Sequence, residues 1–124
     1  MKILIIDDDE AITRISSIYL SKAGHSVQIA EDGSSAMKSL LEEIPDVVLL
    51  DFNLPDIKGP ELLVELRKNG LEKTPIIFMT AQSSQHDETR YINMGAQGLI
   101  PKPIRPGNLE SAIQAILERS SHDS

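Results

Sequence analysis

The sequence contains no cysteine, which excludes disulfide bonds, thiolate metal sites and catalysis by a thiol. It also lacks an excess of basic residues, because 19 Asp and Glu outnumber 12 Lys and Arg and give a formal charge of -7. A surface that binds nucleic acid is therefore not expected. The apolar runs reach only about five residues, far short of the roughly 20 that span a bilayer, and no secretory segment follows Met1-Lys2. We therefore expect a cytoplasmic protein without a membrane span.

The length of 124 residues allows one domain with a hydrophobic core of its own. No linker, internal repeat or low-complexity stretch interrupts the chain before its last five residues, which are polar. We predict one domain over residues 1–119 and a polar C-terminal tail at 120–124. That tail is either a frayed end or the start of a linker.

Short apolar runs alternate along the chain with segments of helical spacing. The runs are residues 3–6, 27–30, 47–50, 76–79 and 98–100. Three of them are unbroken four-residue blocks, as expected for strands covered on both faces of a parallel sheet. The helical segments lie at 12–23, 36–44, 62–66, 84–94 and 109–117, and the first has its apolar stripe at Ile12, Ile15, Tyr19 and Ala23. This pattern predicts the α/β class: a doubly wound (βα)5 sandwich with a five-stranded parallel sheet in the order 2-1-3-4-5.

Ligands of an open α/β sheet bind beyond the carboxyl ends of the strands, so the residues that follow each run are the candidates for chemistry. They are Asp7-Asp8-Asp9-Glu10 after the first run, Asp51 after the third, Thr80 after the fourth and Lys102 after the fifth. Because strands one and three are neighbours in the predicted order, Asp7, Asp8 and Asp51 should converge. Three carboxylates repel one another unless a cation lies among them, and a hard divalent ion such as Mg²⁺ meets that need.

The same positions favour phosphoryl transfer. Thr80 offers a hydroxyl and Lys102 an ammonium, two groups that hold phosphate oxygens. With Asp51 as the nucleophile, attack on a phosphoryl donor gives an aspartyl phosphate. Each residue alone also has an ordinary explanation, such as Asp8 at a helix N-terminus, so the hypothesis depends on the joint pattern. Residues interpreted as surface or turn groups are His25, His86, His122, Asp46 and Asp56.

Four stretches of the sequence resemble the receiver domain of two-component response regulators, the CheY-like family. They are residues 3–10, 47–59, 75–81 and 95–103, and the resemblance covers residues 1 to 119. It implies a phosphorelay signalling domain, not an enzyme, that catalyses only its own phosphorylation and dephosphorylation. The expected partners are a sensor histidine kinase or phosphotransfer protein and, downstream, an effector protein or a missing output domain. The signal would pass through the face of the fourth helix, fifth strand and fifth helix.

The resemblance also implies roles for particular residues. Asp51 is the phosphoacceptor, and the implied Mg²⁺ ligands are Asp7, Asp8, Asp51 and the backbone carbonyl of Asn53. Thr80 and Lys102 bind the phosphoryl group, and the Lys102-Pro103 bond resembles a cis peptide of the family. Asn53 and Gln82 flank the path of the attacking water. One position departs: the family carries Tyr or Phe three residues before the lysine, and this chain has Leu99, so the usual aromatic switch with Thr80 cannot operate as such.

Other functions share parts of this pattern. A haloacid-dehalogenase-like phosphatase also uses an Asp at a strand end beside Mg²⁺, but its general acid is an Asp two residues on, where this chain has Asn53. A flavodoxin-type flavin carrier has the same fold but a Ser/Thr/Gly-rich loop in place of residues 7–10. A receiver-like domain that only binds partners is disfavoured, because all five functional positions are present. The sequence identifies neither the kinase nor the output.

Overall fold

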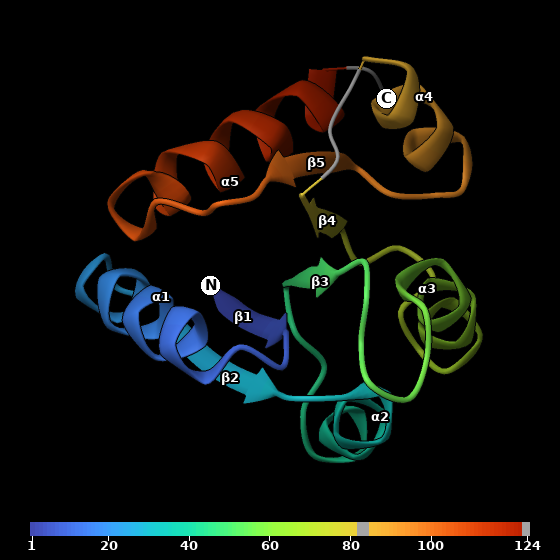
Figure 1. The fold of residues 1–124 in the computed structure, drawn as a ribbon, viewed down its shortest axis with the longest axis horizontal. Helices are drawn as coiled ribbons and strands as arrows, with labels where there is room; N and C mark the ends of the chain where they lie inside the picture. The colour runs from blue at the N-terminus through green and yellow to red at the C-terminus, as the bar shows by residue number, and fades with distance from the viewer. Residues whose placement is uncertain (82–84, 123–124) are drawn as a thin grey trace.

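Five parallel strands form one sheet in the order β2-β1-β3-β4-β5, and helices cover both of its faces (Figure 1). The computed structural model describes residues 1–81 and 85–122, except for the side chains of 85–87 and 120–122. The strands are β1 (Lys2–Ile6), β2 (Ser26–Ala30), β3 (Val47–Asp51), β4 (Ile76–Thr80) and β5 (Gly98–Pro101). The helices are α1 (Glu10–Lys22), α2 (Gly33–Glu42), α3 (Gly59–Lys68), α4 (Gln85–Asn93) and α5 (Pro106–His122). The predicted fold class and strand order are confirmed.

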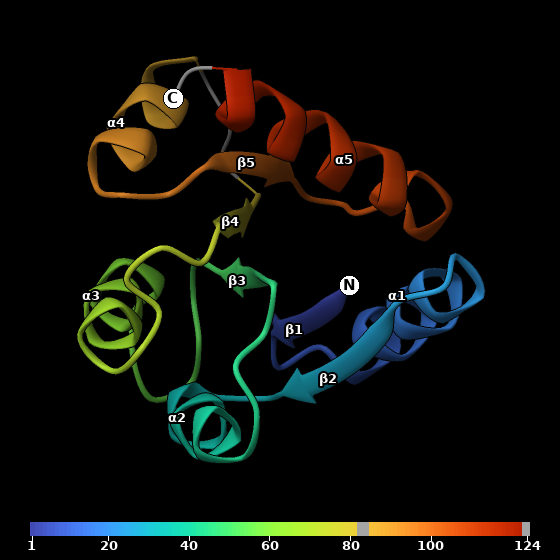
Figure 2. The same ribbon diagram turned by 180° about the vertical axis from the view of Figure 1, so that it is seen from behind.

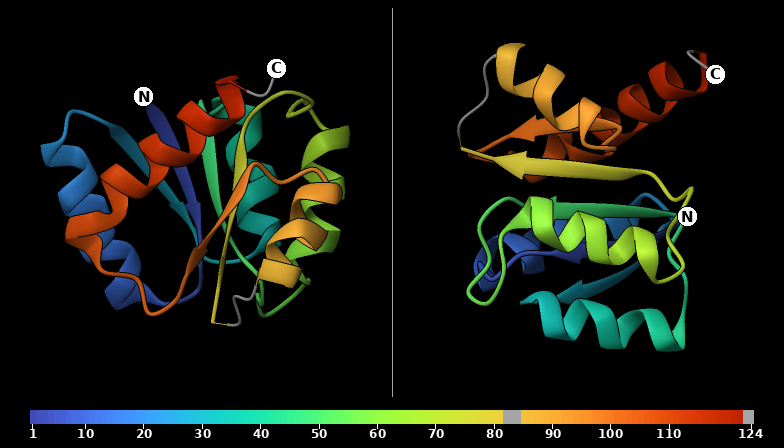
Figure 3. Two further views of the ribbon diagram at one scale, coloured as in Figure 1. Left: turned by 90° about the horizontal axis from the view of Figure 1, so that it is seen from above. Right: turned by 90° about the vertical axis from the view of Figure 1, so that its right-hand side faces the viewer.

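The helices divide into two layers. Helices α1 and α5 lie on one face of the sheet, and α2, α3 and α4 lie on the other (Figures 1 and 2). The view from above shows the same layers edge-on, and the second view faces the layer of α2, α3 and α4 with the strands behind it (Figure 3). Since β1 lies between β2 and β3, the chain reverses its direction of winding there, and the crevice beyond the carboxyl ends of β1 and β3 is the natural ligand site.

The central strands send alternate side chains into two separate apolar cores. On β3, Val48 and Leu50 pack into the core beneath α2, α3 and α4, which we call the α3 core. Val47 and Leu49 pack into the core beneath α1 and α5. All four side chains are fully buried. This burial on both faces is the physical reason for the unbroken apolar blocks in the sequence.

Helix α1 buries a different side from the one that its apolar stripe predicts. Ile15 and Tyr19 belong to the predicted stripe, yet they are 43% and 50% exposed. The buried residues of the helix are Thr13, Ser16 and Leu20. Thr13 tolerates burial because its hydroxyl donates to the backbone carbonyl of Asp9 at 3.0 Å, which satisfies the polar group inside the helix. The prediction for Ile15 and Tyr19 is therefore wrong, and both leave an exposed apolar surface on α1.

The sequence predicts His25 at the surface, but its side chain is only 9% exposed. Its Nε2 lies 2.6 Å from a carboxylate oxygen of Glu110 on α5, and its Nδ1 lies 2.9 Å from the terminal amine of Met1. Glu110 reaches His25 because α1 packs beside α5, and Met1 reaches it because β1 pairs with β2. The surface prediction is thus wrong for His25, and the side chains of His86 and His122 lie outside the described residues.

Asp56 is exposed, as a turn residue would be, but its carboxylate also caps a helix. It accepts hydrogen bonds from the backbone amides of Gly33 at 2.9 Å and Ser34 at 3.1 Å. The first turn of α2 therefore has two acceptors, because Asp32 accepts from the amide of Ser35 at 2.7 Å as well. This contact ties the loop that follows β3 to the start of α2.

The C-terminal helix α5 continues to His122, so residues 120–122 of the predicted tail are helical, and residues 123 and 124 lie outside the described range. The boundary at residue 119 stays a prediction. Within the part of the chain that the structure describes, no helix combines the length and apolar character needed to cross a membrane.

Candidate functional site

Three carboxylates meet at the carboxyl edge of the sheet. Strands β1 and β3 pair with Ile6 opposite Leu50, so Asp7 and Asp51 follow at the same edge. Carboxylate oxygens of Asp7, Asp8 and Asp51 lie within 4.8 Å of one another. Asp7 and Asp51 are buried, with exposed fractions of 2% and 7%, while Asp8 is exposed. These three side chains therefore converge, as the sequence predicts.

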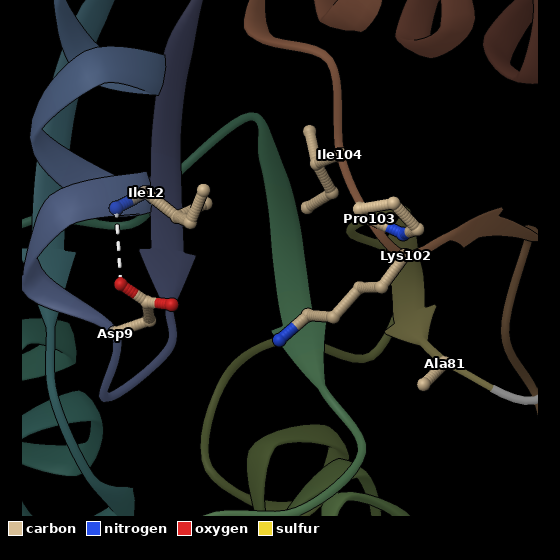
Figure 4. Close-up of a pocket in the computed structure, with 6 residues that line it drawn as sticks. All are labelled: Asp9, Ile12, Ala81, Lys102, Pro103 and Ile104. Atoms are coloured by element: carbon tan, nitrogen blue, oxygen red, sulfur yellow. Dashed lines mark hydrogen bonds between the residues drawn. The ribbon is translucent and has the colours of Figure 1, made fainter.

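Lys102 brings a positive charge into this cluster. Its Nζ lies 3.0 Å from Oδ2 of Asp7 and 3.0 Å from Oδ1 of Asp51. Figure 4 shows the side chain extending from the segment after β5 across the end of β3. The backbone amide of Lys102 donates to the carbonyl of Thr80 at 2.7 Å, and the Lys102-Pro103 peptide bond is cis. The hydrogen bond to Thr80 holds the lysine backbone at the carboxyl end of β4.

The electrostatics of the cluster follow from burial and from its charges. Burial raises the pKa of Asp51, and the negative charges of Asp7 and Asp8 act in the same direction, against a smaller opposing effect of Lys102. Burial alone would lower the pKa of Lys102, but its hydrogen bonds and attraction to Asp51 and Asp7 outweigh burial and raise it. The ammonium therefore stays charged among the carboxylates.

The donor set fits a hard divalent cation. Oδ1 of Asp7 accepts the amide of Asp9 at 3.0 Å, which fixes the carboxylate. Oδ2 of Asp7 is buried and faces the Lys102 ammonium at 3.0 Å. Three carboxylates around this one ammonium leave an excess of negative charge, which suits Mg²⁺, an ion that prefers a few carboxylate oxygens and water.

The loop after β3 is held close to Asp51 by a glycine. The amide of Gly59 donates to the carbonyl of Phe52 at 2.7 Å. A Cβ atom at position 59 would lie 2.8 Å from the carbonyl oxygen of Asp51 and 2.9 Å from Cα of Phe52. Both contacts are with backbone, so a larger residue would displace the loop. Gly59 thereby fixes the backbone of the residue that carries the central carboxylate.

A family model for the response regulator receiver domain matches residues 3–114. The chain belongs to this family. Receiver domains are signalling domains of two-component systems, and they typically bind Mg²⁺ at an acidic pocket. They interact with histidine kinases and output domains. The comparisons give no support to the phosphatase alternative.

Relatives of this receiver domain include bacterial transcriptional regulators. The chain is 35% identical over 119 residues to the alkaline phosphatase synthesis transcriptional regulatory protein PhoP of Bacillus subtilis, covering 96% of this chain and 49% of PhoP. It is 38% identical over 119 residues to the transcriptional regulatory protein CpxR of Klebsiella pneumoniae, covering 96% and 50%. The chain thus spans about half the length of these relatives.

Solved receiver structures have the same fold. The chemotaxis response regulator CheY4 of Vibrio cholerae superimposes with a TM-score of 0.86 at 30% identity, covering 93% of this chain and 97% of that one. The BeF3-activated receiver domain of RstA from Klebsiella pneumoniae gives a TM-score of 0.81 at 30% identity, covering 94% and 98%.

The other predicted site residues of this receiver domain have different surroundings. Thr80 ends β4, is 5% exposed and follows Met79, which pairs with Asp51 across the sheet. Asn53 is exposed, and its side-chain oxygen accepts from Nζ of Lys58 at 3.2 Å, within its own loop. Leu99 is half-buried against the α3 core. Gln82 lies outside the described residues.

A pocket of about 340 Å³ opens beside Lys102 in the receiver domain, and sequence reasoning missed it. It is lined by Asp9, Ile12, Ala81, Lys102, Pro103 and Ile104. In Figure 4, Asp9 and Ile12 face Pro103 and Ile104 across the opening. The carboxylate of Asp9 caps α1 by accepting the amide of Ile12 at 3.1 Å. The only signal in the sequence was the presence of apolar residues beside Lys102 and on the first turn of α1.

Proposed function

We propose that this receiver domain accepts a phosphoryl group on Asp51 from the phosphohistidine of a sensor histidine kinase or phosphotransfer protein. The observation that carries the proposal is the position of Lys102 Nζ, 3.0 Å from both Asp51 and Asp7 within a cluster of three carboxylates. An ammonium so placed can exchange a carboxylate oxygen for a phosphoryl oxygen without leaving the site.

In the proposed reaction, a carboxylate oxygen of Asp51 attacks the phosphorus atom of the donor. A P–O bond to Asp51 forms while the P–N bond to the donor imidazole breaks, and the imidazole nitrogen keeps the electron pair. Water later attacks the same phosphorus, which releases inorganic phosphate and restores the carboxylate. In this reaction Lys102 and Thr80 bind the transferred oxygens.

A magnesium ion belongs to this proposal. The residues that would hold it are Asp7, Asp8, Asp51 and the backbone carbonyl of Asn53. The excess of negative charge in the cluster, three carboxylates against one ammonium, supports the assignment of the carboxylates. When bound, the ion neutralises the negative charge that gathers on the phosphoryl oxygens.

We also propose a downstream partner for the signal. The relatives are named transcriptional regulators and are about twice as long as this chain, which supports an effector or output domain as the downstream partner. We propose that the receiver domain, residues 1–119, acts in the cytoplasm and signals through the face of α4, β5 and α5. Its own phosphorylation and dephosphorylation are the only reactions that it would catalyse.

Phosphorylation with a small donor tests the proposal. With Mg²⁺ and acetyl phosphate, the protein should gain one acid-stable, hydroxylamine-labile phosphoryl group, and Asp51→Asn should gain none. Asp9→Asn is the matched control, because it changes a neighbouring carboxylate outside the three-carboxylate cluster and keeps an acceptor for the α1 cap. Label on Ser, Thr or His would refute Asp51 as the acceptor, and steady turnover of phosphate esters would favour a phosphatase.

A further inference from the structure

Three of the four aromatic side chains of the protein pack together beside the site. The ring centroids of Phe52 and Tyr91 are 5.3 Å apart, those of Phe78 and Tyr91 are 5.2 Å apart, and those of Phe52 and Phe78 are 6.1 Å apart. Phe52 follows β3, Phe78 is in β4 and Tyr91 is in α4. The aromatic triad therefore joins three elements that are separate in the sequence.

One end of the triad is fixed to the phosphoacceptor. Phe52 is the covalent neighbour of Asp51, and its amide donates to the carbonyl of Met79 at 3.1 Å while its carbonyl accepts the amide of Gly59. The backbone amide and the backbone carbonyl of Phe52 are thus both hydrogen-bonded. A displacement of Asp51 must move Phe52 with it, or break these hydrogen bonds.

The other end of the triad anchors α4. Tyr91 is 5% exposed, and it is the one buried residue among the side chains of α4 that the structure describes, at 88–93. The neighbouring Ile92 is 45% exposed. The carbonyl of Tyr91 also accepts the amide of Ala96 at 3.1 Å, in the turn that leads to β5. Within the described part of α4, the Tyr91 ring is therefore the buried anchor of the helix, and Glu88 adds an exposed ion pair with Arg119 of α5 at 3.5 Å.

Leu99 contributes no ring to this region. It pairs with Phe78 across β4 and β5 and packs against the same core as the triad. Aromatic pairs have preferred edge and tilted arrangements, so a shift of one ring changes the favoured place of the next. The direct contact of Phe52 with Tyr91 is a ring-to-ring connection from the residue after Asp51 to α4 that does not involve position 99.

We propose that Tyr91 couples the state of Asp51 to the position of α4, through the contact of its ring with Phe52. The inference rests on the proposed function, because it takes phosphorylation of Asp51 as the input. In this scheme the three rings have two arrangements, and α4 takes a different position on the sheet in each. The phosphoryl group changes the relative populations of these two conformations. Tyr91 is a positioning residue in this scheme, since it acts on α4 and not on the phosphoryl group.

Hydrogen exchange with and without the phosphoryl mimic beryllofluoride and Mg²⁺ tests the coupling. Exchange in peptides that cover residues 88–101 should change about tenfold in the wild type, within the range usual for coupled sites. Tyr91→Phe keeps the ring and should keep this response, whereas Tyr91→Leu should lose it while still being phosphorylated on Asp51. Tyr19→Leu is the matched control, because Tyr19 lies on α1 and is 50% exposed, and its response should equal that of the wild type.

The outcomes separate the two proposals. If the wild type takes up no phosphoryl group, the proposed function fails and this inference fails with it. If Tyr91→Leu is phosphorylated and its α4 response is unchanged, the proposed function stands and the role of Tyr91 is refuted. Loss of the response in Tyr91→Phe would also refute a role for the ring.

A second measurement avoids substitution at position 91. The protein has no Trp and two Tyr, so in the Tyr19→Phe variant the tyrosine fluorescence comes from Tyr91 alone. Full occupancy by beryllofluoride should change the intensity of that emission. An unchanged emission at full occupancy would refute the proposed movement, even if Tyr91→Leu does not fold.

Discussion

The ammonium nitrogen of Lys102 lies 3.0 Å from Oδ1 of Asp51, and the same nitrogen lies 3.0 Å from Oδ2 of Asp7. One positive charge thus faces two buried carboxylates, with Asp8 as a third negative charge within the cluster. Without a bound cation, the cluster carries a net negative charge. Removing the ammonium and removing a carboxylate should therefore have opposite effects on the free energy of unfolding.

Lys102→Met should destabilise the protein in the absence of Mg²⁺. Methionine keeps an apolar side chain of similar length but leaves Asp7 and Asp51 facing each other without a counter-charge. We expect the free energy of unfolding to fall by about 1–3 kcal/mol, less than for a fully buried ion pair because the lysine side chain is 25% exposed. Urea unfolding in EDTA measures this change. Equal stability of the two proteins would show that the ammonium does not balance the cluster.

The stability difference between Asp51→Asn and the wild type should depend on pH. Because the folded protein raises the pKa of Asp51 above its ordinary value of 3.8, the stability linked to this proton is complete below pH 3.8 and is lost as pH rises through the raised pKa. Asparagine does not titrate. The variant should therefore be more stable than the wild type at pH 7, and its advantage should shrink as pH falls toward 3.8. Thermal unfolding of both proteins across this range without Mg²⁺ measures the trend, and an advantage that grows at acidic pH would contradict it.

Mg²⁺ should stabilise the folded protein by binding to the carboxylate cluster. At an ion concentration ten times the Kd, mass action adds about 1.4 kcal/mol to the free energy of unfolding. Asp8→Asn should remove most of this gain, because it removes one of the three converging carboxylates. Asp9→Asn should keep the gain, since Asp9 lies outside the cluster and caps α1. The melting temperature with and without Mg²⁺ measures each effect, and equal shifts in Asp8→Asn and the wild type would exclude Asp8 as a ligand.

Asp56→Ala should weaken the start of α2. The carboxylate accepts the amides of Gly33 and Ser34, and loss of such a cap costs about 0.5–2 kcal/mol. Asp56→Asn should lose less, because the amide oxygen can still accept one of the two. Urea unfolding gives the cost, and hydrogen exchange at residues 33–36 locates it. If the alanine variant shows normal exchange there, the cap contributes nothing to α2.

The sequence determined the elements of this domain and the residues at their carboxyl ends. Unbroken apolar blocks such as 47–50 require burial on both faces, and this requirement predicts a parallel sheet between two helical layers. Once strands one and three are neighbours, Asp7 and Asp51 must lie at one edge. These inferences need only local patterns and chain topology, and they gave the strand order and the convergence of the carboxylates.

Only the tertiary structure decided which side of each helix is buried and which distant groups meet. The apolar spacing of α1 could not reveal that Thr13 would be buried with its hydroxyl satisfied inside the helix, while Tyr19 stayed exposed. The contact of His25 with Glu110 joins residues 85 positions apart, and the ring of Tyr91 on α4 reaches Phe52 in the loop after β3. A sequence pattern records the period of one segment, whereas such contacts depend on how two segments pack, which only the complete fold fixes.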